Sequence, residues 1–475
     1  MKLTPRPLSD RDFWTAARTD PRLAPLWARV EADSAAATAH PPLPQANDFL
    51  AALRSNDRRR VDRFWREWRG VFASLILRRC ALGIDQADAD DRLVDWLWGH
   101  LNQPTWAVVA HLSPRELPRL DTQTLDLASC EMAMFFAETL EVLGPWIQSV
   151  SGTLAGSILH EIDRRVLTPY ARGQSVWWDG SGERTDFNNW LGVCAGSILA
   201  ACVALENLGH PRPEARARAL AGLRRFFADG FTADGECDDG VVYWLYGVGY
   251  ACPGLSRLAP EELATAIDMD RFRLVASYPR RVHLIADCFY AANDASHQNR
   301  AAVWFVPWLA HVAADDFLAQ WAADWPDFRT RHISEQLRIL AFASLPQAAS
   351  PRPASSRPAS SRPAVRRVEL LRDQQVCIVQ VPTSGGLLTA TLGGGHNAER
   401  HNHNDLGHCT LMLDEQHILP DLGNIEYVTD FFGPRRYEYL AASSRGHSCP
   451  LVNGRPQRSG PEAAARLLAW TDGPD

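Results

Sequence analysis

The chain has 475 residues, of which 46% are hydrophobic and 22% are charged. Because one hydrophobic core seldom extends beyond about 250–300 residues, we expect two domains in a globular protein. The formal net charge of −7 argues against nucleic acid or an anionic membrane as a general partner. It leaves room for a local basic cleft that binds an acidic substrate.

The N-terminal ten residues, MKLTPRPLSD, contain no apolar stretch of signal-peptide length. No segment has 18 uninterrupted apolar residues, so we expect no transmembrane helix. The sequence therefore predicts a cytoplasmic protein, or a periplasmic one if the true N-terminus is missing. The ten cysteines are scattered without a CxxC pair, which favours reduced core thiols over disulfides or a cysteine-based zinc site.

The chain up to residue 345 has the pattern of a helical domain. Apolar residues recur at helical spacing in 129–147, 196–208, 214–229 and 333–345. Gly144-Pro145 is expected to stop the first of these helices. Many helices with short Gly/Pro breaks indicate stacked helical hairpins, and the lack of a fixed repeat favours a closed (α/α) toroid over an open solenoid.

The composition changes twice after residue 345. Residues 346–366 carry a tandem SSRPA stretch, which predicts a disordered or semi-extended linker. The period then becomes two, and we expect strands at 376–381, 387–392 and 409–413. The sequence thus predicts a β-sandwich over 367–475. This part ends without a closing strand, so we expect that the domain is truncated.

The richest cluster of chemical groups is HNHNDLGH at 401–408, where three histidines and a carboxylate lie within eight residues. His401 and His403 are two apart, so in extended backbone they project from one face. Imidazoles with a later carboxylate such as Asp421 are a frequent ligand set for a divalent transition metal, zinc above all. His408 and His417 receive no role and are expected at the solvent or sheet surface.

Five segments in order resemble the heparinase II/III family of polysaccharide lyases. The β part carries HNHNDLG at 401–407, LPDLG at 419–423 and SRGHS at 444–448; the helical part carries NNW at 188–190 and DGECDDGVVYW at 234–244. The resemblance implies an (α/α) toroid followed by an antiparallel β-sandwich. It also implies an acidic polysaccharide or oligosaccharide as substrate, and a homodimer is possible.

β-Elimination on a 4-linked uronide removes the C5 proton, so the site needs groups that neutralise the carboxylate, a base, and an acid for O4. The resemblance implies that Asn189 and His401 hold the carboxylate and that Tyr243 protonates the leaving oxygen. A Tyr243 tyrosinate with a depressed pKa could also act as the base, given cationic neighbours.

The resemblance further implies one zinc ion, mainly structural, held by His403, Asp421 and His447. It would fix the loop that presents His401. Asp405 is the alternative ligand, although hydrogen bonding to the local loop backbone is its simpler role.

Substrate contacts are expected from two sources. Arg435 and Tyr437 lie between the metal ligands, where a guanidinium suits carboxylate or sulfate and a tyrosine can stack on a sugar. Trp190 and Trp244 fall near the proposed cleft and could form sugar platforms, with core packing as the alternative for each.

Trp190 also marks a departure, because many relatives have a histidine, proposed as the general base, directly after the motif asparagine. The leading hypothesis is therefore a uronide lyase, and the alternative is a uronide-binding homologue with impaired catalysis. A hydrolase would instead need two acids across the cleft, for which the candidates are Glu183, Asp186, Glu236, Asp238 and Asp239.

Overall fold

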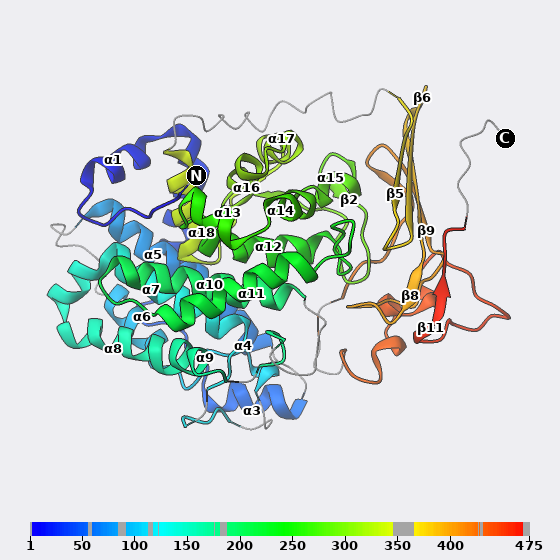
Figure 1. The fold of residues 1–475 in the computed structure, drawn as a ribbon. Helices are drawn as coiled ribbons and strands as arrows, with labels where there is room; N and C mark the ends of the chain where they lie inside the picture. The colour runs from blue at the N-terminus through cyan, green and yellow to red at the C-terminus, as the bar shows by residue number, and fades with distance from the viewer. Residues whose placement is uncertain are drawn as a thin grey trace.

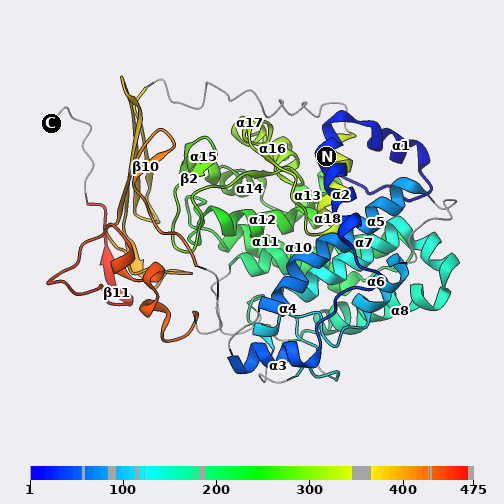
Figure 2. The same cartoon turned by 180° about the vertical axis from the view of Figure 1, so that it is seen from behind.

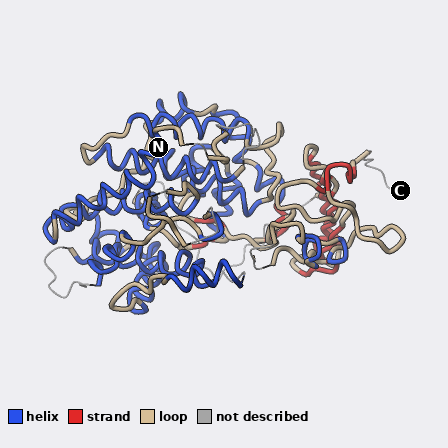
Figure 3. Tube along the Cα trace, turned by 90° about the horizontal axis from the view of Figure 1, so that it is seen from below, coloured by secondary structure: helices blue, strands red, loops and turns tan. Residues whose placement is uncertain are grey.

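The computed structural model describes residues 2–55, 59–83, 92–112, 117–121, 123–174, 176–180, 188–344, 365–425, 427 and 431–468. Helices fill the first part of the chain, and the larger sheet follows in a separate region beside them (Figure 1, Figure 2). Viewed from below, the helices and the main group of strands occupy opposite sides of the molecule (Figure 3).

The helices that begin before residue 200 are α1 Arg11–Thr19, α2 Ala24–Ala36, α3 Ala46–Ser55, α4 Arg59–Arg63, α5 Arg69–Leu82, α6 Arg92–Leu101, α7 Leu127–Val150, α8 Gly152–Ile162, α9 Thr168–Ala171 and α10 Asn189–Asn207. The later helices are α11 Pro213–Asp229, α12 Val241–Leu255, α13 Pro260–Ala266, α14 Met269–Ala276, α15 Tyr278–Val282, α16 Val306–Ala313, α17 Asp316–Asp324 and α18 Ile333–Ala343. Short 3-10 or π turns lie at Pro21–Leu23, Phe64–Trp68, Val109–His111, Asp163–Leu167, Arg436–Glu438, Leu440–Ala442 and Ser444–Gly446.

The four helices predicted from periodicity are confirmed as α7, α10, α11 and α18. The expected stop at Gly144-Pro145 is wrong, because α7 continues through Pro145 to Val150. Trp146 and Ile147 beyond the proline are buried, and their packing outweighs the hydrogen bond that proline removes. α10 is long and apolar enough to cross a membrane by composition, but 89% of that window is buried within the protein, as in a core helix.

α10 and α12 pack closely and run parallel. A Cβ added at Gly192 would lie 2.7 Å from the carbonyl oxygen of Gly247, and one added at Gly196 would overlap the backbone of Tyr250. The contacts advance together along both helices, which fixes the direction. Glycine at these positions lets the two backbones approach to a distance that any side chain would prevent.

Three more helices share this direction. Asn207 at the end of α10 donates to Glu141 near the end of α7 at 2.7 Å. Tyr250 and Pro253 of α12 bond in turn to Glu335 and Arg338 of α18. The α5–α7 pair is set by contacts from Arg69 to Glu131 and from Arg79 to Trp146. A circuit of parallel helices is what a closed toroid requires, and the toroid itself stays a prediction.

The strands are β1 His283–Ile285, β2 Cys288–Phe289, β3 Ala301–Ala302, β4 Pro326–Asp327, β5 Arg367–Leu371, β6 Val376–Thr383, β7 Gly386–Gly393, β8 Gly395–Asn397, β9 Cys409–Leu413, β10 Gln416–Leu419 and β11 Gly460–Ala465. The strands predicted at 376–381, 387–392 and 409–413 are confirmed as β6, β7 and β9.

The main sheet has five antiparallel strands in the order β10-β9-β7-β6-β5, and β8 pairs with β11 in a separate ribbon. The two-layer sandwich and the domain boundaries stay predictions. α18 ends at Ala343 and β5 begins at Arg367, so most of the predicted linker over 346–366 lies outside the described residues.

The β5–β6 side of the sheet is attached to the helical region. Gln380 of β6 donates to the carbonyl of Leu284 at 2.5 Å, and Gln374 donates to the carbonyl of Cys237 at 2.7 Å. Arg281 pairs with Glu369 of β5 at 2.8 Å. These bonds hold the loop after β8 against the beginning of α12.

Candidate active site

The first turn of α12 meets the loop after β8 at the boundary between the helical and β regions. The ring of Tyr243 stacks on His401 with a centroid distance of 4.0 Å and an interplanar angle of 16°. His401 Nδ1 lies 3.1 Å from Oδ1 of the buried Asp239. His401 also has a positive φ of 52°, which is uncommon outside glycine and occurs often at functional sites. Two residues predicted to share a site are therefore in contact.

The Tyr243 hydroxyl is the start of a relay of hydrogen bonds. It lies 2.5 Å from the hydroxyl of Tyr427, which donates to Asp294 Oδ2 at 2.9 Å. Burial raises the pKa of Tyr243 far above its ordinary value, and Tyr427 and Asp294 raise it further. The expected depressed pKa is therefore wrong. Tyr243 is held protonated, as a proton donor must be.

Asn189 begins α10 beside the same turn of α12. The backbone N–H of Trp190 donates to the Asn188 side chain at 3.0 Å, which caps the helix. Asn189 is buried, and within the described residues its Oδ1 has no hydrogen-bond partner. Its Cα lies 3.0 Å from the place of a Cβ on Gly247, one turn after Tyr243. A buried, unpaired amide at this end suits a ligand.

The parallel direction of α10 and α12 adds to the electrostatics of this end. Both helices begin here, at Asn189 and Val241, and their free N–H groups carry partial positive charge. An anionic group such as a uronate carboxylate is stabilised at such helix N-termini.

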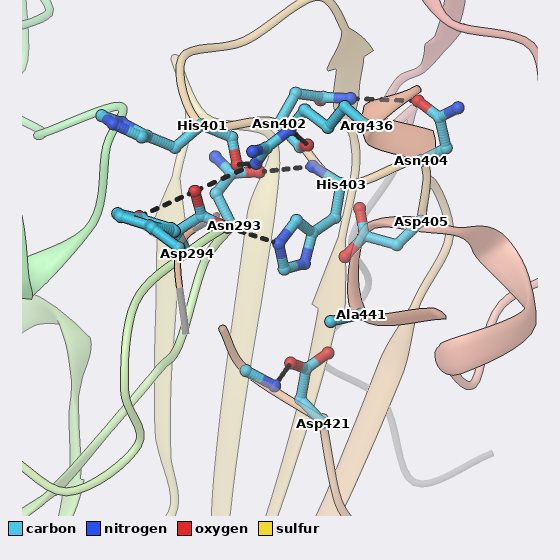
Figure 4. Close-up of polar contacts among 12 residues, drawn as sticks. Asn293, Asp294, His401, Asn402, His403, Asn404, Asp405, Asp421, Arg436 and Ala441 are labelled. Atoms are coloured by element: carbon cyan, nitrogen blue, oxygen red, sulfur yellow. Dashed lines mark hydrogen bonds and ion pairs between the residues drawn. The ribbon is translucent and has the colours of Figure 1, made fainter. Parts of the chain in front are cut away.

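Asp294 joins this end to the histidine segment (Figure 4). Its Oδ1 lies 2.8 Å from His403 Nε2, and its Oδ2 lies 3.0 Å from Arg436 Nη2. Arg436 also donates to the backbone carbonyls of His401 and Asn402, at 2.6 and 2.9 Å. Burial alone would raise the pKa of Asp294, but the His403 hydrogen bond and the Arg436 charge lower it. The carboxylate therefore stays ionised.

Two of the three predicted metal ligands, Asp421 and His447, are in direct contact, and the ring of His403 lies beside that of His447. His447 Nδ1 is 2.7 Å from Asp421 Oδ2, and the rings of His403 and His447 have centroids 5.1 Å apart. Asp405 and His408 belong to the same cluster. The Nδ1 atom of His408 and the Nδ1 atom of His447 each lie 3.7 Å from Asp405 Oδ2. Burial tends to raise the pKa of Asp421, but the hydrogen bond from His447 lowers it below its ordinary value.

Ligand atoms of Asp405, His408 and Asp421 all lie within 4.8 Å of one another, which is close enough for one metal ion. His403 Nδ1 is buried and has no hydrogen-bond partner among the described residues. Two or three imidazoles with one or two carboxylates match the donors that zinc prefers. The residues therefore fit a zinc ion, with Asp405 and His408 as members that the predicted set of three omits.

The expectation that His408 faces solvent or the sheet surface is wrong, because it is 2% exposed and its Nε2 lies 3.2 Å from Asp421 Oδ2. His417 does lie on the sheet, half-buried in β10 against His297, with ring centroids 4.9 Å apart.

The residues predicted to contact the substrate lie in different surroundings. Trp244 is 0% exposed and donates to the carbonyl of Val275, so it is a core residue and its prediction as a sugar platform is wrong. Arg435 lies on the surface, paired with Glu438 at 2.8 Å. Tyr437 is half-buried, and its hydroxyl accepts from Asn402 at 3.3 Å. Roles of Arg435 and Tyr437 in binding stay predictions.

Trp190 is half-buried in a row of rings at the start of α10. It lies between His111 and Trp177, with centroid distances of 4.7 and 4.6 Å. Trp177 is 44% exposed. A sugar platform at Trp190 stays a prediction.

Among the described acids considered for a hydrolase, Glu236 and Asp239 are each engaged by another side chain, and burial raises the pKa of Asp238. Glu236 is fully buried, paired with Arg281 at 2.9 Å and bonded to the N–H of Gln374. Asp239 is bonded to His401, and Glu183 and Asp186 lie outside the described residues.

The sequence suggested no role for three residues that hold the site together, namely Asp294, Tyr427 and His408, and it suggested for Arg436 only the binding of a carboxylate or sulfate. Asp294 stands in a segment, AANDAS, without a recognisable pattern. Nothing in the sequence distinguishes Arg436 from Arg435; the structure shows that Arg436 is buried and Arg435 is exposed. His408 alone carried a usable signal, because it belongs to the histidine-rich segment.

A scan against models of protein families matched none, and a search of curated proteins also found no match. Among solved structures, the chain is similar to a crystal structure of heparinase III, with 12% identity and a TM-score of 0.59. That match covers 97% of this chain and 69% of the other. A heparan sulfate lyase, HepC from Pedobacter heparinus, matches with 13% identity and a TM-score of 0.45, over 98% of this chain and 73% of the other. The chain therefore has a heparinase-like lyase fold, with a helix-rich region and a separate β-sheet region.

Proposed function

We propose that this protein is a lyase that cleaves 4-linked, uronic-acid-containing polysaccharides or oligosaccharides by β-elimination. One observation carries the proposal: Tyr243 and His401, which come from different regions of the chain, stack at 4.0 Å at the end of the helical region where Asn189 also lies. The heparinase III-like fold agrees with this chemistry. The proposal extends to a closed (α/α) toroid followed by a β-sandwich.

Each group has a task in that reaction. Asn189 offers a buried side-chain amide, whose Nδ2 hydrogens can donate to a carboxylate, and His401, oriented by Asp239, offers an imidazole, so that the two can bind the uronate carboxylate. Binding of the carboxylate stabilises the charge that develops when the C5 proton leaves. Tyr243, held protonated by its surroundings, gives its proton to the departing O4.

The direct test is absorbance near ~232 nm, where a conjugated unsaturated uronide absorbs, with a panel of heparan sulfate, chondroitin, hyaluronan, alginate and other uronides. Tyr243→Phe should lower kcat by at least about 100-fold, because general acid catalysis typically supplies 10²–10⁴-fold. Tyr439→Phe is the matched control, since the ring of this half-buried tyrosine packs on Phe431, whereas that of Tyr243 stacks on His401. Wild-type turnover by Tyr243→Phe would disprove the role of the tyrosine.

A second candidate is a uronide-binding homologue with impaired catalysis, favoured by the tryptophan at position 190. Binding of a uronide without any unsaturated product, measured by calorimetry beside the absorbance assay, would support it over the lyase.

We further propose one zinc ion, mainly structural, at His403, Asp421 and His447, with Asp405 or His408 available as a further ligand. The orphaned His403 Nδ1 and the contact of His447 with Asp421 support this site, and the close group of Asp405, His408 and Asp421 supports the further ligands. Such an ion would neutralise part of the buried carboxylate charge and stabilise the loop that carries His401.

Purified protein should contain about one zinc per chain by elemental analysis. His403→Ala should lose the metal and lower Tm, because a metal bound only by the folded state stabilises it. His160→Ala, at an exposed position, should change neither value. A metal-free wild type whose Tm does not respond to added zinc would contradict the site.

The other expectations remain proposals: an acidic glycan as partner rather than nucleic acid or membrane, a possible homodimer, and a cytoplasmic location, or a periplasmic one if the true N-terminus is missing.

A further inference from the structure

The residues assigned to the proposed elimination do not include a base. Tyr243 is held protonated, so it cannot take the C5 proton while it also donates to O4. His401 stacks on Tyr243 and is assigned to the carboxylate. His403 and His447 are bonded within the buried metal cluster. Position 190, where a histidine base would be expected by resemblance, is a tryptophan.

An imidazole nevertheless stands next to that position. The ring of His111 contacts the ring of Trp190 at a centroid distance of 4.7 Å. His111 belongs to the 3-10 turn Val109–His111, which lies at the N-terminal end of α7. Its side chain is 27% exposed, so solutes can reach it.

His111 is part of a rigid histidine–carboxylate pair. Its Nδ1 lies 2.7 Å from Oδ2 of Asp126, the buried N-cap residue of α7. Asp126 is held in turn by the N–H groups of Val108 and Ser129, at 2.9 and 2.8 Å. A carboxylate on Nδ1 fixes the proton there and leaves Nε2 with its lone pair free. Within the described residues Nε2 has no hydrogen-bond partner.

The fold puts this pair at the same end as the candidate active site. α7, α10 and α12 run parallel. Trp190, the second residue of α10, contacts His111, and Asn189, the first, lies against Gly247 of α12. Asn189 therefore has His111 next to its neighbour Trp190 and the helix that carries Tyr243 against its own backbone.

We propose that His111, oriented by Asp126, is the general base of the elimination and takes the place of the histidine absent at position 190. This inference rests on the proposed lyase function. Nε2 of His111 accepts the C5 proton of the uronide, and the C5–H electron pair becomes the C4–C5 double bond. The C4–O4 bond breaks, and O4 receives the proton of the Tyr243 hydroxyl. Solvent then returns a proton to the Tyr243 oxygen and removes one from His111.

Placing the base and the acid on two separate residues affects which uronates can react. A single tyrosine that served as both base and acid would require H5 and O4 on the same side of the sugar ring. With the base on His111 that restriction is lifted, so the substrate panel must contain uronates of both C5 configurations.

The first test is His111→Ala. We expect kcat on the best uronide of the panel to fall by about 100-fold or more while KM stays within about threefold, and added imidazole to restore part of kcat. Asp126→Asn should also lower kcat, without rescue by imidazole. His160→Ala, an exposed histidine on α8, is the control and should behave as wild type. Tm of each variant separates these effects from misfolding.

A second measurement does not depend on turnover. Diethyl pyrocarbonate should modify His111 in the Tyr243→Phe variant, read by peptide mass spectrometry, and the uronide on which the wild type is most active should protect His111 but not His160. Turnover by His111→Ala within threefold of an active wild type, or failure of that uronide to protect, overturns this inference alone. A wild type that forms no unsaturated product on any uronide overturns the lyase proposal, and the base role with it.

Discussion

Asp294 is the residue on which the candidate site depends most. Its two carboxylate oxygens contact His403, Tyr427 and Arg436, all within 3.0 Å. It therefore links the hydroxyl relay of Tyr243 to the metal cluster and to the guanidinium that holds the His401 backbone. A carboxylate with this many charged or strongly polar partners remains ionised although it is buried.

The relay makes a prediction about Tyr427. Tyr427→Phe removes the partner of the Tyr243 hydroxyl at 2.5 Å and frees one oxygen of Asp294. We expect kcat to fall about fivefold, since a lost hydrogen bond is worth about 1 kcal/mol and a factor of ten about 1.4 kcal/mol. KM should change little, and the loss should be much smaller than in Tyr243→Phe. Equal losses in the two variants would mean that Tyr427, rather than Tyr243, delivers the proton.

At the scale of elements, the site exists because α10 and α12 run parallel in close contact and begin at the same end of the helical region. Gly196 faces the backbone of Tyr250 and Ala251, and a Cβ there would lie 2.6 Å from the Cα of Ala251. Gly196→Ala should therefore push the helices apart, lowering the unfolding free energy by about 1–3 kcal/mol. Chemical denaturation measures this loss.

Gly156→Ala is the matched control for that substitution. Gly156 lies inside α8, and nothing stands within 4 Å of its added Cβ. Alanine should stabilise this helix by up to about 1 kcal/mol, because it has the higher helix propensity. If both glycine variants behaved alike, the close approach of α10 and α12 would not explain the use of Gly196.

The elements also explain what the sequence could and could not predict. Periodicity identified α7, α10, α11, α18 and three strands, because apolar residues recur along each at helical or alternating spacing, although α7 and α10 are buried almost all round. It could not place Asp294 or Tyr427, since both stand in loops where contacts across the fold, rather than neighbours in sequence, decide the position. Trp244 shows the opposite limit: a motif position next to Tyr243 turned into the core, because adjacent residues of a helix face different directions.

At the scale of the whole molecule, buried histidines make stability depend on pH. Burial lowers the pKa of His100 and His283 to about 4 and that of His332 to about 3, from 6.5. The unfolded chain takes up protons below pH 6.5 that these side chains refuse when folded. Each histidine therefore reduces stability as the pH falls from 6.5 towards its folded pKa. Glu399, whose pKa burial raises to about 7, acts in the opposite direction.

His332 allows this dependence to be isolated. It caps α18, its Nε2 lies 2.8 Å from the carbonyl of Glu131, and it is 0% exposed in the middle of the helical region. His332→Gln should lower stability at every pH, because it disturbs these bonds. Between pH 7.5 and 5, however, the variant should lose roughly 2 kcal/mol less than wild type, from 1.36 kcal/mol for each pKa unit below 6.5. Urea unfolding at the two pH values measures the difference. Parallel losses in both proteins would mean that His332 is protonated in the folded state, against the direction that its burial imposes.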